Sequence, residues 1–371
     1  MSSTSEASVS WAQALAWRMG QQFLDSPSAG SVADVVRRLG AVLSADDSLA
    51  DLAVRTRLAI SSPGDVAVSL ADGEVIEVFA FRGAKHYLAA DEGGIYLALR
   101  SAGRQWELAS WVEHYRLTPA DWPDFRAAVR AALIDVPLTV VELGQALVRQ
   151  RAYRHLRPVF DAGATTLIKA LMWQGDVSFG PRRDGVPTLQ RLDTNPLWRP
   201  IPDLEEAGPR AITGYLGAYG PATLDHLHSW FGEGLSAGRK RLARWFSELG
   251  DRLAAVDVDG TLAYVVRDDV EALEAAVPSD AVRLLPAHDQ WVIGPGTSDA
   301  HVTPPALRDL ITRKANPVVV GGVVRGTWTR HGDELALAWF GEGRRPDAGI
   351  RREADRLADI VGRDLRLVFA Q

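Results

Sequence analysis

An internal repeat in the middle of the chain constrains the fold most strongly. Two segments open alike, with Pro137-Leu-Thr139 and Pro221-Ala-Thr223, and each continues into an amphipathic helix. Threonine is a favoured N-cap residue, and Glu142 completes a capping-box pattern with Thr139. In each copy, a second helix and then two short strands joined by a turn are expected. Because helix, helix, hairpin is the order of a winged helix, the repeat predicts two such units in tandem.

The same elements are predicted in both copies. The second helices are expected at 163–173 and 236–249. The strands are expected at 177–179 and 188–190 in the first copy, and at 253–256 and 262–265 in the second. Asp259-Gly260 lies between the last two strands, and Asp-Gly is a strong signal for a two-residue hairpin turn.

The segments on either side of the repeat have other patterns. Before it, the sequence predicts helices at 11–24, from 31 or 32, at 48–58, 66–70, 91–102 and 119–133, and a β-hairpin with strands at 73–81 and 85–89. After it, residues 282–340 are predicted as strands with a turn at Gly321-Gly322, and 346–361 as an Arg-rich helix. We therefore expect an α+β chain with an N-terminal helical and β-hairpin region at 1–135, winged helices at 136–205 and 206–278, and a β-rich, barrel-like domain with a closing helix at 279–371.

Composition excludes several classes of protein. The 371 residues contain no cysteine, which excludes disulfides, thiolate metal sites and a cysteine nucleophile. His226 and His228 have no clustered carboxylates beside them, so no metal is expected, and without a phosphate loop or dinucleotide fingerprint no cofactor is expected either. No segment approaches the roughly 20 apolar residues that span a bilayer, and no basic signal start is present. We expect a cytoplasmic protein.

Positive charge gathers in the repeat, although the whole chain carries −6. The tip of the first predicted hairpin carries Arg182 and Arg183, where packing does not require them. Winged helices place their second helix in a DNA major groove and touch phosphate with the hairpin. The residues predicted to contact duplex DNA are therefore Lys169, Arg182, Arg183, Arg239, Lys240 and Arg241. The alternative for those on helices is a solvated helix face.

Four short runs, in this order and spacing, resemble stretches of the winged-helix DNA glycosylases of the AlkZ and YcaQ type. They are Arg82-Gly83-Ala84-Lys85-His86, Gly220-Pro221, Leu284-Leu285-Pro286-Ala287-His288-Asp289 and Val324-Arg325-Gly326-Thr327-Trp328. The resemblance implies tandem winged helices and a β-rich barrel curved around a DNA channel. Some members excise bulky alkylated bases or interstrand crosslinks. We therefore expect a monomer whose partner is alkylated or adducted duplex DNA, and which associates with the nucleoid through that DNA.

The resemblance also implies roles for particular residues. Arg82, Lys85 and His86 are expected to contact DNA, and His288 and Asp289 to line the channel. The family usually has Thr-Leu where this chain has Ala84-Lys85, and Phe where it has His288. Lys85 is therefore either a phosphate contact or a solvated strand residue, and His288 is either a titratable channel residue or a structural one.

The family's catalytic group is missing. Members carry Gln-x-Gln or Gln-x-Asp, and alignment through Asp51-Leu52-Ala53-Val54 places the glutamines at Leu43 and Ala45. Neither side chain can hydrogen-bond to water or stabilise developing positive charge. Asp46 and Asp47 follow directly and are the candidate catalytic carboxylates. The alternative is that they only cap the next helix, for which Asp is a favoured residue.

Two functions remain open on this sequence. The first is a DNA glycosylase that removes alkylated or bulky bases with a non-standard catalytic loop. The second is a noncatalytic DNA-binding protein that shields damaged DNA or regulates transcription. Both require duplex binding, and only the first requires a group that acts on the N-glycosidic bond.

Overall fold

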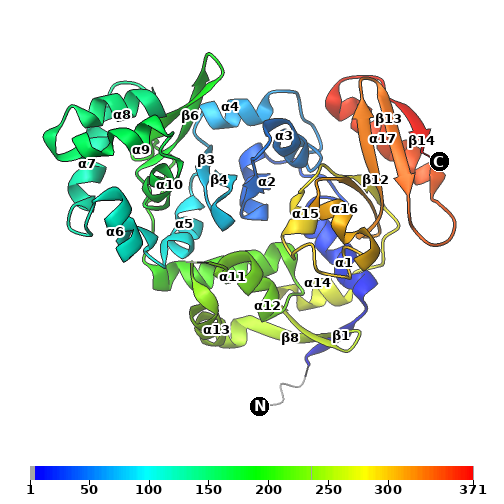
Figure 1. The fold of residues 1–371 in the computed structure, drawn as a ribbon. Coiled ribbons are helices and arrows are strands. Elements are labelled where there is room, and N and C mark those ends of the chain that lie inside the picture. Colours follow the sequence, from blue (N-terminus) through cyan, green and yellow to red (C-terminus); the bar gives the residue numbers. More distant parts are fainter. Residues whose placement is uncertain (1–4, 235, 371) are drawn as a thin grey trace.

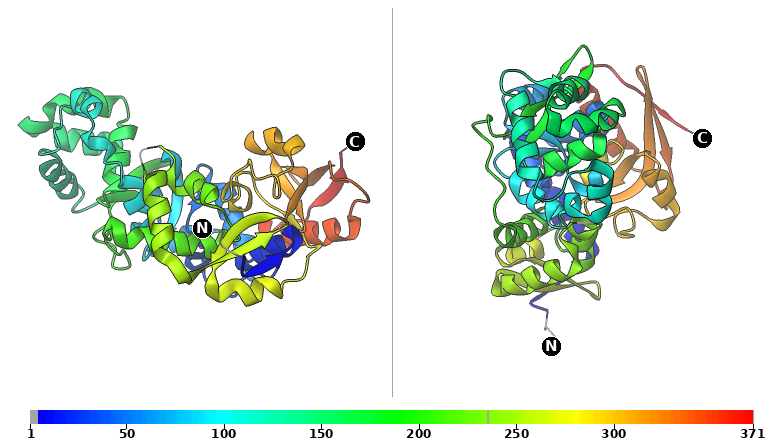
Figure 2. Two further views of the ribbon diagram at one scale, coloured as in Figure 1. Left: turned by 90° about the horizontal axis from the view of Figure 1, so that it is seen from below. Right: turned by 60° about the vertical axis from the view of Figure 1, so that its left-hand side comes forward.

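The computed structural model describes residues 5–234 and 236–370. The chain is elongated, with helices from residues 109–173 at one end and strands from residues 316–369 at the other (Figures 1 and 2). Helices and strands are mixed along the chain, which confirms the predicted α+β class. Within the described ranges, no helix is long and apolar enough to cross a membrane.

The N-terminal region has the predicted helices and hairpin. The predicted helices are α1 (Trp11–Gln21), α2 (Val32–Leu39), α3 (Asp47–Arg55), α4 (Asp65–Ala71) and α5 (Gly93–Ser101). A further helix, α6 (Ala109–Tyr115), was not predicted. Ser10 and Ser31 begin α1 and α2 with capping boxes, which fixes where these two helices start. Strands β3 (Val75–Phe79) and β4 (Lys85–Ala89) pair antiparallel, and the two-residue strand β2 (Val42–Leu43) adds to the free edge of β4.

The first repeat has the predicted winged-helix order. It follows α7 (Trp122–Ala132) and comprises β5 (Leu138–Thr139), α8 (Val140–Val148), α9 (Arg157–Asp161), α10 (Thr165–Trp173), β6 (Val177–Arg183) and β7 (Val186–Arg191). Thr139 and Glu142 form the predicted capping box. Strand β6 also pairs with β3, so one sheet runs in the order β2-β4-β3-β6-β7-β5. The predicted domain boundary between residues 135 and 136 therefore divides strands that belong to one sheet.

The second repeat has the same order. It comprises α11 (Leu204–Tyr219), α12 (Leu224–Leu227), a π-helical turn at His228–Gly232, α13 (Gly238–Leu249), β8 (Leu253–Val258) and β9 (Thr261–Val266). Helix α11 approaches α13 at Gly208, where a Cβ atom would lie 2.2 Å from the buried Trp245 ring. The strand β1 (Ala7–Val9) pairs parallel with β8, which the sequence did not predict. The short helix α14 (Val270–Glu274) follows the hairpin.

The C-terminal domain is a curled five-stranded sheet with one long helix. Its strands, in spatial order, are β10 (Val282–Leu284), β11 (Asn316–Val320), β12 (Val323–His331), β13 (Glu334–Trp339) and β14 (Arg366–Phe369). Helix α17 (Asp347–Val361) packs Ile350, Ala354 and Leu357 against this sheet. The prediction of strands throughout 282–340 was wrong between β10 and β11, where the chain forms the short helices α15 (Gln290–Ile293) and α16 (Arg308–Thr312). Asp289 caps α15 and so begins a helix where a strand was expected.

Candidate active site and nucleic-acid interface

The loop between β2 and α3 holds the positions of the family's glutamines. Leu43 pairs with His86 of β4, and its side chain is half-buried, whereas Ala45 is exposed. Both side chains are apolar, so neither can orient a water molecule. Any polar group that acts at this loop must therefore come from its neighbours in sequence or in space.

Asp46 caps helix α3, which is the role that the sequence left open as the alternative. Its Oδ1 accepts hydrogen bonds from the Ser48 hydroxyl at 2.7 Å, the Ser48 backbone N–H at 3.0 Å and the Leu49 N–H at 3.2 Å. These bonds lower the pKa of Asp46, chiefly through the Ser48 hydroxyl, and the nearby Lys314 adds to the effect. Hydrogen bonds to a carboxylate favour its charged form. Because all three bonds end on Oδ1, the second oxygen, Oδ2, takes no part in the cap.

Asp47 joins the loop to the first wing. The Arg182 guanidinium lies 3.1 Å from its carboxylate, and both side chains are about half exposed, at 48% and 54%. The structure thus brings a residue predicted to contact DNA beside a residue predicted to be catalytic. Arg183, the next residue on the wing, forms an ion pair with Glu142 at the start of α8.

A partly buried polar cluster next to the loop was not found from the sequence. The fully buried Ser44 hydroxyl donates to Glu77 Oε1 at 2.8 Å, and the Lys85 ammonium donates to the same oxygen at 2.7 Å. Lys85 also lies 5.3 Å from the Phe179 ring centre. Lys85 is therefore neither the free phosphate contact nor the solvated residue that the sequence suggested, because it fixes Ser44 and the loop path through Glu77. The register of the hairpin, which brings Glu77 and Lys85 onto one face, was the available signal.

Two residues of the Arg82–His86 run form hydrogen bonds to other groups of the protein. His86 is 2% exposed, and its Nδ1–H donates to the Ala84 carbonyl at 3.0 Å. Burial lowers the pKa of His86 to about 4, so the ring is neutral and the predicted DNA contact is not available to it. Arg82 donates to the Ser229 carbonyl and hydroxyl, both at 2.9 Å, and so ties the hairpin to the second winged helix.

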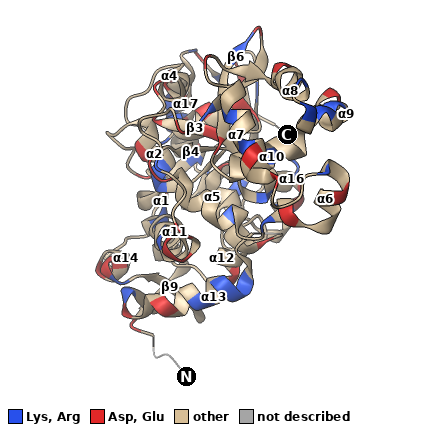
Figure 3. Ribbon diagram, turned by 90° about the vertical axis from the view of Figure 1, so that its left-hand side faces the viewer, with Lys and Arg blue, Asp and Glu red and all other residues tan. Residues whose placement is uncertain are grey.

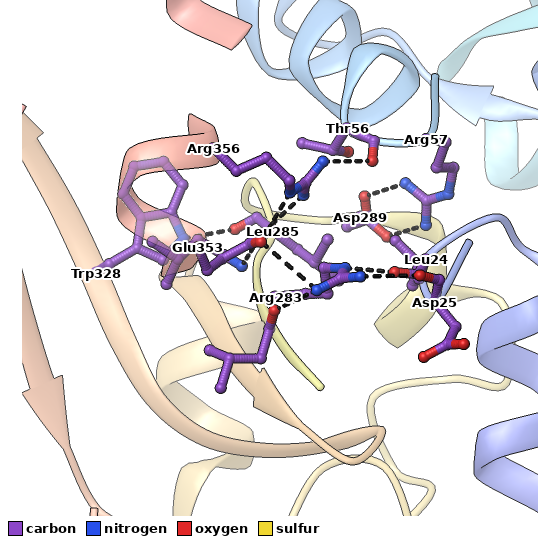
Figure 4. A network of polar contacts seen from close by, with 12 residues as sticks. Leu24, Asp25, Thr56, Arg57, Arg283, Leu285, Asp289, Trp328, Glu353 and Arg356 are labelled. Atoms are coloured by element: carbon purple, nitrogen blue, oxygen red, sulfur yellow. Dashed lines mark hydrogen bonds and ion pairs between the residues drawn. The ribbon is translucent and has the colours of Figure 1, made fainter. Parts of the chain in front are cut away.

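Asp289 was predicted to line the channel but is buried in an ion pair. Its carboxylate is 1% exposed and accepts from the two terminal nitrogens of Arg57 at 2.7 and 2.8 Å. Figure 4 shows this pair beside a second buried carboxylate, Glu353, which accepts from Arg356. Asp289 therefore braces the end of the α3 segment against the C-terminal domain. His288 is half-buried, and its Nε2 lies 3.5 Å from the Thr312 carbonyl.

The remaining predicted DNA contacts lie on the helices α13 and α10. Basic residues follow one another at the start of α13, where the ribbon is blue (Figure 3). Arg239 pairs with Asp225 at 2.6 Å, and Arg241 donates to the Ala237 carbonyl at 3.2 Å. Lys240 forms no ion pair with any described residue. On α10, the Lys169 ammonium lies 4.7 Å from the Phe79 ring centre, so its charged head contacts the hairpin.

Similarity to known proteins identifies the family. A sequence model described as "DNA glycosylase AlkZ-like" matches residues 36–360. The chain belongs to the AlkZ-like DNA glycosylase family. An interstrand DNA cross-link repair glycosylase of Streptomyces sahachiroi is 35% identical over 361 residues, which cover 95% of this chain and 97% of the relative. The structure of the Streptomyces sahachiroi DNA glycosylase AlkZ matches with a TM-score of 0.92 and 33% identity, covering 98% of this chain and 100% of that one.

Membership of the AlkZ-like family makes DNA the partner of this chain. The fold of this chain matches that of a family member over almost its whole length. Among residues 5–234 and 236–370, no group of three or more His, Asp or Glu residues gathers as a metal-binding cluster would. The roles of the individual site residues remain predictions.

Proposed function

We propose that this AlkZ-like DNA glycosylase hydrolyses the N-glycosidic bond of alkylated or bulky-adduct bases in duplex DNA, with Asp46 in place of the missing glutamines. The observation that carries the proposal is the Asp46 carboxylate, held charged by its cap hydrogen bonds directly after the second glutamine position. A fixed negative charge stabilises an oxocarbenium-like transition state, and the second oxygen orients the attacking water. Asp47, which is paired with Arg182, is the second candidate.

The two winged helices supply the duplex contacts in this proposal. Arg182 and Arg183 sit at the tip of the first wing, and each pairs with an exposed carboxylate. Exposed ion pairs of this kind contribute little stability, so a DNA phosphate can replace the carboxylate at small cost. The protein acts as a monomer and meets its substrate on the nucleoid.

The relative supports the proposed class of lesion. The Streptomyces sahachiroi protein is described as an interstrand cross-link repair glycosylase and is 35% identical to this chain. We therefore include interstrand crosslinks, besides single alkylated bases, among the substrates. Excision at the altered base leaves an abasic site, which is the product to be measured.

One observation favours a second function. Leu43 and Ala45 carry no polar group, and Asp46 has an evident structural role as the cap of α3. A protein with such a loop can bind damaged DNA and shield it, or regulate transcription, without hydrolysing the N-glycosidic bond. In that case DNA binding persists and base release is absent.

Single-turnover base release separates the two functions. Excess protein is incubated with a duplex that carries either one 7-alkylguanine or one interstrand crosslink, and abasic sites are converted to strand breaks with hot alkali. We expect breaks at the lesion that accumulate exponentially, and none in an undamaged duplex of the same sequence. Tight binding of the damaged duplex with no breaks above the protein-free control would leave only the noncatalytic function.

A further inference from the structure

A partly open cleft of about 480 Å³ lies between α3 and the C-terminal domain. Leu49 and Leu52 of α3 face Leu357 of α17 across it, and Trp328 of β12 also contributes to its wall. The exposed residues Arg330 and Arg363 also line it. The cleft thus combines an apolar floor with cationic side chains, and its volume is within the usual range of roughly 300–1,000 Å³ for ligand pockets.

The two exposed arginines carry charge that the protein does not neutralise. The cleft also contains Arg55 and Asp51, but these pair with each other at 3.1 Å, and Arg55 donates to the Ile360 carbonyl as well. Arg330 and Arg363 are exposed and form no ion pair with any residue in the described part of the chain. The cleft therefore has a net positive charge at its mouth and favours an anionic ligand with an apolar body.

The cleft begins beside the catalytic loop. Ser48 lines it, and the Ser48 hydroxyl is the strongest cap contact of Asp46. Lys314, which lies close enough to Asp46 to lower its pKa, precedes the cleft residue Asn316 by two positions. On the other side of the loop, Arg182 reaches Asp47. Cations therefore flank the loop on both sides and continue into the cleft.

We propose that this cleft binds a nucleotide of the DNA strand that flanks the lesion. The phosphodiester lies between Arg330 and Arg363, whose planar guanidinium groups match phosphate oxygens, and the sugar and base rest on the apolar floor. The proposal rests on the proposed function, because it takes DNA held at the loop as the ligand. It adds a contact from the C-terminal domain that the winged helices do not provide.

Salt-dependent binding tests the two arginines. Affinity for a fluorescent duplex with a central 7-alkylguanine is measured by anisotropy between low and high salt for the wild type, Arg330→Gln, Arg363→Gln and the double variant. Since one neutralised phosphate contributes about 0.9 to the slope of log K against log salt, the double variant should lose about one unit of slope and each single variant a part of it. We expect each to lose roughly fivefold to tenfold in affinity. Arg351→Gln, an exposed arginine of α17 that does not line the cleft, is the matched control.

A second arm identifies the ligand as a flanking nucleotide. The duplex is shortened stepwise on either side of the lesion, and the effect of the double variant should disappear when one side, and not the other, is removed. Slopes and affinities equal to those of Arg351→Gln would overturn the proposal, as would an effect that survives removal of both flanks. Base release by the wild type is measured separately. If the wild type releases no base, the proposed function fails; base release by the variants does not count against that function.

Discussion

At the scale of single residues, Asp46 combines a structural and a proposed chemical role on different atoms. The three hydrogen bonds that cap α3 all end on Oδ1, and they also keep the carboxylate charged. The sequence could name both roles, because Asp is a favoured cap and also a possible catalytic group. It could not distinguish them, because the path of a loop is set by contacts such as Ser44 with Glu77, which lie 33 positions apart.

The buried His86 should make the free energy of unfolding depend on pH more strongly than an exposed histidine would. Burial lowers its pKa from the usual 6.5 to about 4, so the folded protein binds fewer protons than the unfolded chain between these values. The free energy of unfolding should therefore fall by roughly 3 kcal/mol as the pH drops from about 6.5 to 4. Urea unfolding at several pH values measures this slope.

The variant His86→Leu should have a flatter dependence of unfolding free energy on pH over the same range. Lost packing and the lost hydrogen bond change its stability at every pH alike, so the slope remains the informative quantity. His331→Leu, at an exposed position, is the control and should keep the wild-type slope. Equal slopes for wild type and His86→Leu would mean that His86 is not held neutral.

At the scale of elements, local signals predicted the repeats well. Capping residues at Thr139 and Thr223 and the Asp259-Gly260 turn act within a few residues, so the sequence alone marks where these helices and hairpins begin. Two of the missed elements, β1 and β14, depend on distant partners. Strand β1 exists only through β8, and β14 only through β13. A short segment that pairs with a distant strand has no periodicity of its own to detect.

The buried ion pair between Arg57 and Asp289 holds two elements together. Arg57 lies just after Thr56, the C-cap residue of α3, and Asp289 caps α15 of the C-terminal domain. The variant Asp289→Ala leaves the Arg57 guanidinium buried without its charged partner, which typically costs about 3–5 kcal/mol. Urea unfolding monitored by tryptophan fluorescence should show this loss.

Asp280→Ala provides the comparison, because Asp280 is exposed and has no ion pair with a described residue. We expect this control to stay within about 0.5 kcal/mol of the wild type, as surface substitutions usually do. A loss below about 1 kcal/mol in Asp289→Ala would show that the pair does not brace the two elements.

At the scale of the whole molecule, the loop lies where separate parts of the chain meet. The wing reaches it through Arg182, the hairpin through Lys85 and Glu77, and the C-terminal domain through Lys314. Buried carboxylates fix that domain in place (Figure 4). The fold class and the family could be predicted because their motifs are local and ordered. The cleft and the cluster at Glu77 could not, because each forms only when distant segments pack.

The central claim is that a charged carboxylate at this loop takes the catalytic role of the missing glutamines. Single-turnover base release from a 7-alkylguanine duplex by Asp46→Asn tests it most directly, since Asn caps a helix about as well as Asp and only the charge is lost. We predict a rate at least roughly 100-fold below the wild type, with unchanged duplex affinity and unchanged thermal midpoint. A wild-type rate of base release in Asp46→Asn would contradict the claim.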